Sequence, residues 1–289
     1  MDNRGFKVIL FALGICILSS CEINTPDSDS PSKPSAEEAE PAKINSTEDN
    51  SSKQTEERIS KDTLRFNRAF QDAWKKAELN FDSPHFSKEY YFYPDDSSYA
   101  IKIEILIGNL FTDSEKYFLL RRHVPWATYL NLYQIRNGKA FKILERKQSE
   151  MSYRSDTIFD VNGDQINDFV VHWHPVSGCC RRNIYSVYLK KEDRSFSSAY
   201  RFINPTFSPE EHIIRGISYG HPGEAGLYKF KWNGLAVDSL EFIYRNTSRK
   251  DQFIKTSKAK YKPTASEGEI LKEIPEEYLQ IESIDWFEA

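Results

Sequence analysis

Aromatic side chains are confined almost entirely to residues 61–289, and this confinement limits what the chain can fold into. The chain has 19 Phe, 16 Tyr and 5 Trp, and only Phe6 and Phe11 precede residue 61. Aromatic and β-branched residues favour strands over helices. The aromatic-rich part therefore predicts a β-rich globular domain over residues 61–289, long enough for one substantial domain or two small ones.

One segment at the start of this domain has a helical pattern instead. Asp62 is a typical N-cap residue, and apolar side chains from Phe66 to Ala77 recur at spacings of three and four. This spacing predicts one N-terminal amphipathic helix that runs from Asp62 to about Leu79.

The rest of the domain shows strand patterns joined by tight turns. The pairs Asn137-Gly138 and Asn233-Gly234 each separate two apolar runs, which indicates two hairpins. A third hairpin is predicted between residues 184–189 and 196–202, and a final strand is predicted to end near Trp286. The expected fold is mainly β, with antiparallel hairpins in a sandwich or a propeller-like arrangement. The similar segments LYQIRNG and LYKFKWNG reflect either a faint internal repeat or shared turn chemistry.

Residues 22–60 have the composition of a disordered tether. They contain no aromatic residue and hold ten acidic residues against four basic ones. Such a segment cannot bury enough apolar area to offset its chain entropy. The chain has a net charge of −4, and its excess of acidic residues comes from this segment. The globular part has no concentrated basic stripe, so nucleic acid is not an expected partner.

The first 21 residues follow the plan of a secretory signal. A slightly basic start precedes the apolar run Val8–Leu18, which is too short to span a bilayer as a mature helix. The run ends in Leu18-Ser19-Ser20-Cys21. This ending resembles the lipobox of bacterial lipoproteins, which is a Leu, two small residues and a Cys. The alternative is an ordinary signal peptide that is cleaved elsewhere.

The lipoprotein resemblance implies a location and a modification. Residues 1–20 would be removed, and Cys21 would carry acyl chains such as palmitate that together give stable membrane anchoring. Residues 21–60 would then be the lipidated Cys and its acidic tether. Because Glu22 rather than Asp follows Cys21, the resemblance implies the outer membrane, on its periplasmic or surface face.

An acidic loop is the second strong feature. Side-chain oxygens recur at Asp160, Asn162, Asp164 and Asp168, and the carbonyl of Ile166 supplies a further oxygen. Calcium prefers six to eight oxygen ligands, and a tight loop with this spacing can wrap the ion. The loop resembles the calcium loops of FG-GAP and EF-hand proteins, in which such a segment leads straight into a strand. The resemblance implies bound Ca²⁺ as a structural staple rather than a catalytic centre.

The acidic loop also departs from the calcium-loop pattern. Gln165 stands where the loop normally has Gly, and Val171 stands where an EF-hand has Glu. The alternative is an Asp/Asn-rich turn held without metal by side-chain hydrogen bonds to the backbone.

A second group of candidate residues follows the loop. Histidines alternate with apolar residues on the predicted strand after the loop, and two adjacent cysteines come next. The cysteines could form a strained vicinal disulfide, remain as thiols, bond to another chain, or join the histidines as zinc or copper ligands. The candidate cluster consists of His172, His174, Cys179, Cys180, His221 and Glu224.

The function expected from these features is a membrane-anchored envelope lipoprotein that acts as a binding or assembly module. Its partner would be an envelope protein or a glycan, and inhibitor-like or immunity-like proteins occur in this class. No catalytic residue is assigned, because the chain has no Gly-x-Ser-x-Gly elbow, phosphate loop or His-Glu-x-x-His motif. The alternative is a periplasmic hydrolase or redox enzyme that uses the histidine and cysteine cluster.

Overall fold

The computed structural model describes residues 48–94, 99–176 and 182–289, with side chains from residue 61 onward. The predicted signal peptide, the lipidation at Cys21 and the first part of the predicted tether lie outside these residues. The chain divides into units Met1–Asn50 and Ser51–Ala289, and the second unit contains all of the sheets. The predicted mainly-β class is confirmed, because the described part contains 15 antiparallel strands in three sheets and two α-helices.

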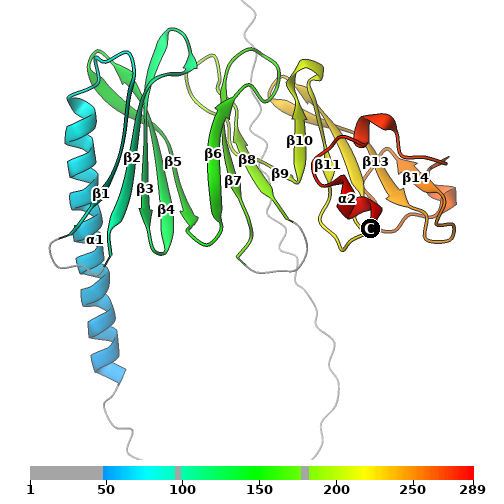
Figure 1. The fold of residues 1–289 in the computed structure, drawn as a ribbon, viewed down its shortest axis with the longest axis horizontal. Helices are drawn as coiled ribbons and strands as arrows, with labels where there is room; N and C mark the ends of the chain where they lie inside the picture. Colours follow the sequence, from blue (N-terminus) through cyan, green and yellow to red (C-terminus); the bar gives the residue numbers. More distant parts are fainter. Residues whose placement is uncertain (1–47, 95–98, 177–181) are drawn as a thin grey trace, which may run out of the picture. The chain divides into compact units, whose positions relative to one another are not determined.

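Each sheet is a meander in which consecutive strands are neighbours (Figure 1). Sheet I contains β1 (Phe86–Phe92), β2 (Ile101–Thr112), β3 (Glu115–Val124), β4 (Ala127–Arg136) and β5 (Lys139–Ser149). Sheet II contains β6 (Tyr153–Phe159), β7 (Asp168–Trp173), β8 (Ile184–Tyr188) and β9 (Tyr200–Ile203). Sheet III contains β10 (Pro205–Ser208), β11 (Ile213–Ile217), β12 (Leu227–Asn233), β13 (Ala236–Arg245), β14 (Phe253–Thr256) and β15 (Glu269–Leu271).

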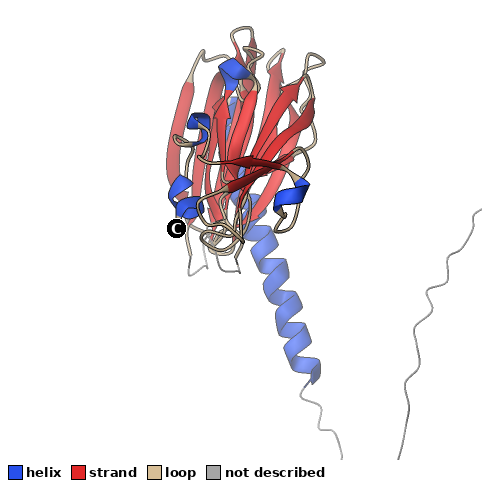
Figure 2. Cartoon of the chain, turned by 90° about the vertical axis from the view of Figure 1, so that its right-hand side faces the viewer, coloured by secondary structure: helices blue, strands red, loops and turns tan. Residues whose placement is uncertain are grey.

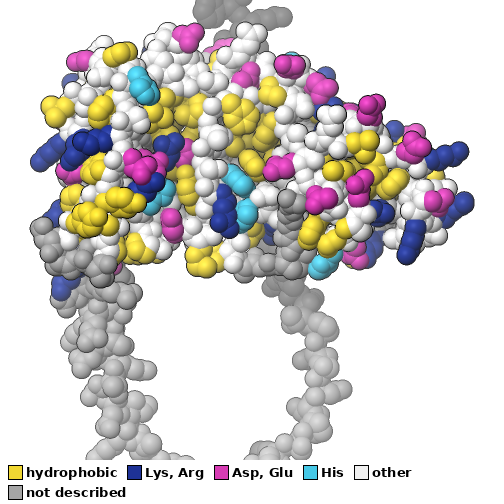
Figure 3. Space-filling view, in the orientation of Figure 1, with side chains coloured by type: hydrophobic (Ala, Val, Ile, Leu, Met, Phe, Trp, Pro, Cys, Tyr) yellow, Lys and Arg dark blue, Asp and Glu magenta, His cyan; other side chains and the backbone are white. Residues whose placement is uncertain are grey.

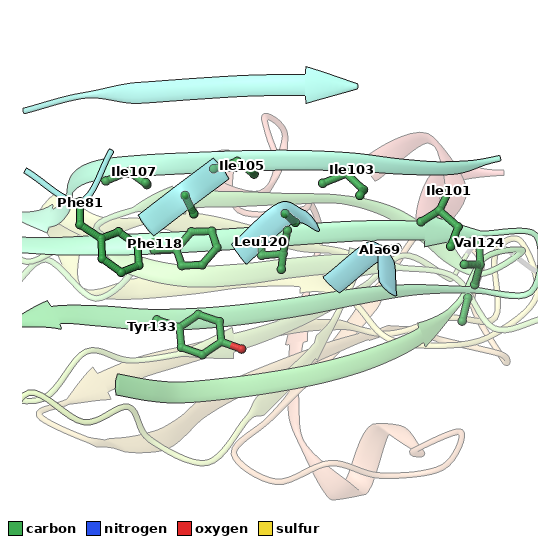
Figure 4. Close-up of a cluster of buried hydrophobic side chains, with 13 residues drawn as sticks. Ala69, Phe81, Ile101, Ile103, Ile105, Ile107, Phe118, Leu120, Val124 and Tyr133 are labelled. Carbon is green, nitrogen blue, oxygen red and sulfur yellow. The ribbon is translucent and has the colours of Figure 1, made fainter. Parts of the chain in front are cut away.

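Helix α1 (Glu48–Glu78) packs on the outer face of sheet I. Three alanines, Ala69, Ala73 and Ala77, are fully buried and let the helix approach the sheet closely. Opposite them, a row of isoleucines points from β2 toward the helix, every second residue from Ile101 to Ile107 (Figure 4). Because side chains alternate along a strand, the residues between these isoleucines face sheet II instead.

The remaining buried clusters lie between the sheets and beyond sheet III, and they define the order of the layers. Leu119 and Leu130 of sheet I pack with Phe169 of sheet II. Val170 and Val187, on the other face of sheet II, pack against sheet III. The outer face of sheet III is covered by the C-terminal segment with α2 (Ile284–Glu288). Figure 2 views the sheets from the α2 side of Figure 1.

The structure differs from the sequence expectation at the start of α1. The helix begins at Glu48 rather than at Asp62, so its first part lies within the segment expected to be a tether. Residues 48–60 contain Glu, Lys, Gln and Arg, which are strong helix formers. Asp62 lies inside the helix, where its carboxylate accepts hydrogen bonds from Arg65 and Tyr99 at 3.0 Å each.

The two Asn-Gly hairpins are both present, but their turns differ. Asn137 and Gly138 occupy the β4–β5 turn with φ angles of 50° and 69°, as a type I′ turn requires. In the other hairpin Asn233 pairs with Ala236, so the turn lies one residue later than predicted. The ladder of this hairpin is irregular opposite Lys229 and Phe230, where Leu240 of β13 is the extra residue. The predicted final strand is wrong, because Trp286 lies in α2.

The antiparallel order sorts the connections between strands onto two opposite ends of the sheets. The acidic-loop end holds the β6–β7 loop with Asp160 and the β12–β13 turn. The histidine end holds the β3–β4 and β5–β6 turns and the segment after His174. The two candidate regions are therefore separated by the length of β7, about 17 Å for six residues.

Candidate functional site

The acidic loop is held by hydrogen bonds from backbone N–H groups to its own side chains. The two carboxylate oxygens of Asp160 accept from Gly163 at 2.6 Å and from Gln165 at 2.8 Å. Asn162 Oδ1 accepts from Asp164 at 3.2 Å, and Asp164 Oδ1 accepts from Ile166 at 2.8 Å. Such hydrogen bonds are the ones expected of an Asp/Asn-rich turn that is held without metal. A carboxylate oxygen has a second lone pair, so the same oxygens can also serve a cation.

Asp168 closes the loop from a fully buried position. One of its oxygens accepts from Val161 N–H at 3.1 Å, and the other accepts from Lys190 N–H at 2.8 Å. Its side chain is 0% exposed. Burial raises the pKa of Asp168 to about 7, and the nearby carboxylates of Asp164 and Asp160 act in the same direction. The loop therefore concentrates negative charge that a cation would stabilise.

Two residues of the loop adopt left-handed backbone conformations. Gly163 has φ = 82°, and a Cβ atom there would lie 2.1 Å from the Pro209 carbonyl oxygen. Gln165, at the position where calcium loops normally have Gly, has φ = 67°. His212 Nδ1 lies 2.6 Å from the Asn162 carbonyl oxygen and joins the loop to sheet III. Among the described residues, no three His, Cys, Asp or Glu side chains form a group that could hold a metal ion.

The histidine end brings two of the predicted cluster residues together. His172 Nε2 and His174 Nε2 lie 3.0 Å and 2.6 Å from the same atom, Asn183 Oδ1. Because an amide oxygen only accepts, both Nε2 atoms carry a hydrogen. The His172 ring stacks on Tyr185 with 4.5 Å between centroids. Burial lowers the pKa of His172.

The other members of the predicted cluster have different surroundings. Glu224 forms an ion pair with Lys262 at 3.5 Å. The carbonyl of His221 accepts hydrogen bonds from the N–H groups of Glu224 and Ala225. Cys179 and Cys180 lie outside the described residues.

A charged cleft lies between sheets I and II at the histidine end, with a volume of about 790 Å³. On the face shown in Figure 3, acidic, basic and histidine side chains gather over sheet I. The cleft is built by residues from β1, β2, β3, β6 and the turns beside them. Its charged and aromatic lining consists of Tyr91, Lys102, Glu104, Arg121, His123, Glu150, Tyr153, Arg154 and Asp156.

An arginine–aspartate pair forms the floor of the charged cleft. Arg121 donates from Nε and Nη2 to the two oxygens of Asp156 at 2.8 Å and 2.5 Å. The side chain of Asp156 is fully buried, and Tyr153 donates its hydroxyl to it at 2.6 Å. Such a bidentate pair fixes both side chains, so the floor of the cleft is rigid.

Glu104 stands beside this pair, close to nitrogen atoms of three side chains. Its carboxylate lies 3.4 Å from His123 Nε2, 2.8 Å from Lys102 Nζ and 3.6 Å from Arg121 Nη1. The hydrogen bond with His123 and the nearby cations lower the pKa of Glu104 to about 2, although burial opposes this. The carboxylate is therefore ionised throughout the physiological pH range.

The charged cleft was not found from the sequence because its residues come from strands far apart in the chain. The available signal was the alternation along β2, where Lys102 and Glu104 interrupt an otherwise apolar run. The same end of the sheets exposes apolar side chains from three turns. They are Trp126, Met151 and Val176, which are 42%, 73% and 58% exposed.

Among the described residues, no helix is long and apolar enough to cross a membrane. No family model, curated protein or solved structure matches the chain.

Proposed function

We propose that the protein is a lipid-anchored binding module of the bacterial cell envelope, which uses the histidine end of its sheets to hold a partner. The observation that carries this proposal is the charged cleft together with the exposed side chains of Trp126, Met151 and Val176 around it. Concave sites that combine apolar contacts with a few fixed polar groups are typical of ligand recognition.

The chemistry of the cleft favours binding over catalysis. The charges on its floor are already paired with one another, as in the Arg121–Asp156 pair, so they present fixed hydrogen-bonding groups. Thr128 has a hydroxyl 2.9 Å from His123 Nδ1, as a nucleophile beside a base would. However, Thr128 is fully buried and donates to Glu150, so its hydroxyl does not face a substrate.

The anchor and the loop complete the proposal. Cys21 carries the lipid, residues before α1 act as the tether, and an N-terminal amphipathic helix closes one side of a propeller-like stack of sheets. Calcium in the Asp160 loop stabilises sheet II against sheet III. The lipid assignment is tested by metabolic labelling with a palmitate analogue, which the Cys21→Ser variant should abolish.

Site-specific crosslinking tests the binding role. A photoreactive residue at Met151, which is 73% exposed at the histidine end, should give defined adducts in intact cells. The matched position is Leu235, an apolar residue that is 50% exposed at the acidic-loop end. Adducts at Met151 and none at Leu235 support the proposal. Equal labelling at both positions, or none at either, contradicts it.

A further inference from the structure

Arg154 is an exposed cation whose orientation is fixed by a chain of hydrogen bonds. Its Nε atom lies 3.2 Å from Nδ1 of His174. Since Nε2 of His174 donates to Asn183, Nδ1 is the acceptor and Arg154 Nε–H is the donor. An arginine held through Nε presents the two Nη groups of its guanidinium in a defined direction.

The chain continues into the protein interior. The backbone N–H of Asn183 donates to Asn204 Oδ1 at 2.9 Å, and Asn204 Nδ2 donates to the carbonyl of Ile217 at 3.3 Å. Asn204 is buried. Four connected residues beside and within sheets II and III thus position one surface arginine. A surface charge without a binding role would not need such positioning.

The fixed guanidinium has no acidic partner within residues 61–94, 99–176 and 182–289, where no ion pair with Arg154 is found. Glu150 lines the same cleft, is 37% exposed and accepts the hydroxyl hydrogen of Thr128 on one oxygen only. The cleft therefore presents a cation and a carboxylate that do not contact each other. A ligand that carries both charges at a distance complements this arrangement.

We propose that the charged cleft binds a short zwitterionic peptide, with the peptide carboxylate on Arg154 and its ammonium group on Glu150. Arg154 can hold a carboxylate through two parallel hydrogen bonds from its Nη groups. Tyr91, which is 55% exposed, also lines the cleft and provides surface for the peptide's apolar part. This assignment rests on the proposed binding function and specifies the ligand class for it.

The probe for this site is tetraalanine, titrated into the full-length protein in detergent and followed by backbone NMR shifts. Its C-terminal amide and its N-acetyl form each lack one charge, and each should bind about 10-fold or more weakly. Arg154→Gln should weaken the zwitterion about 10-fold and leave the amide unaffected, and Arg154→Lys should restore part of the affinity. Arg249→Gln, at an exposed arginine of the β13–β14 turn, is the matched control and should change nothing.

The role of His174 as a positioning residue has its own test. His174→Gln keeps an acceptor for Arg154 and should retain the affinity, whereas His174→Leu should lose it. Equal binding of all three peptides, no binding of any, or full affinity of Arg154→Gln would overturn the peptide assignment. If the Met151 crosslink persists in that case, the binding function stands and only the ligand class fails.

Discussion

The guanidinium carbon of Arg122 lies 3.9 Å from the ring centroid of Phe66, inside the interface between α1 and sheet I. The rings of Phe70 and Tyr129 lie 4.9 Å and 5.6 Å away, and Nη2 donates to Asn131 at 2.8 Å. Burial lowers the pKa of Arg122 to about 10. The interface thus holds a charge on aromatic faces rather than on a carboxylate.

Replacing this charge tests what holds α1 in place. We expect Arg122→Met to leave the free energy of unfolding unchanged or to raise it by about 1 kcal/mol, because a buried cation without a carboxylate is costly. Arg122→Ala should lower it by about 2 kcal/mol, because the packing against the rings is lost. Urea denaturation measures both variants. A Met variant as unstable as the Ala variant would show that the charge itself stabilises the interface.

Gln165 is strained in the acidic loop. A φ of 67° raises the free energy of a residue with a Cβ atom by roughly 1–2 kcal/mol. Glycine avoids this strain, and its greater conformational entropy in the unfolded chain lowers the stability by less than that amount. We expect Gln165→Gly to stabilise the domain by about 0.5 kcal/mol, measured by thermal and urea denaturation. Gln165→Ala, which keeps the Cβ atom, is the control and should give no gain.

Gly163 cannot accept a side chain. A Cβ atom there would meet the Pro209 carbonyl oxygen at 2.1 Å, so Gly163→Ala should cost about 3 kcal/mol. Gly138 has a similar φ of 69° but nothing within 4 Å of an added Cβ. Gly138→Ala should therefore cost only about 1 kcal/mol, and the difference between the two variants measures the clash. Equal losses would mean that the acidic loop moves away from Pro209 freely.

Glu104 predicts a specific dependence of stability on pH. Its pKa of about 2 in the folded protein lies below the usual value near 4.5. The stabilisation it provides is therefore complete above pH 4.5 and is lost as the pH falls toward 2. Free energies of unfolding measured across this range should fall less steeply for Glu104→Gln than for the wild type. The exposed Glu273 supplies the control, because Glu273→Gln should keep the wild-type slope.

Calcium should stabilise the domain through the acidic loop. Calcium at 100 times its dissociation constant adds about 2.7 kcal/mol to the free energy of unfolding, and a chelator removes it. Asp160→Asn should abolish the shift in melting temperature. Asp193→Asn, on the neighbouring β8–β9 turn, should retain it. If calcium does not change the melting temperature, the acidic loop is a turn that is held by its hydrogen bonds alone.

The features predicted well from the sequence are those encoded by neighbouring residues. The Asn137-Gly138 turn follows from two adjacent residues that accept positive φ. The opposite faces of β7 follow from alternation, with Phe169 packed toward sheet I and Val170 toward sheet III. The β12–β13 turn was misplaced by one residue, because Asn233 still pairs with Ala236 and the turn residues are Gly234 and Leu235.

The charged cleft depends on contacts that the sequence does not encode locally. Arg121 and Asp156 are 35 residues apart, and their pairing depends on how sheet II packs against sheet I. In the same way, the acidic loop and His172 are close in sequence but lie toward opposite ends of β7. The fold therefore keeps these two candidate regions apart although they are adjacent in the sequence.

The meander order of the three sheets has a consequence for how such a chain can vary. Each sheet is one uninterrupted stretch of sequence, and the buried clusters of the described residues join it to the layer before it and the layer after it. A whole sheet could therefore be gained or lost at the β5–β6 or β9–β10 junction without rethreading the remainder, as in repeat proteins. The end layers are different, because α1 and the C-terminal segment each cover an apolar face that no further sheet of the described part protects. Relatives of different length should thus conserve the two end layers and vary in the number of sheets between them.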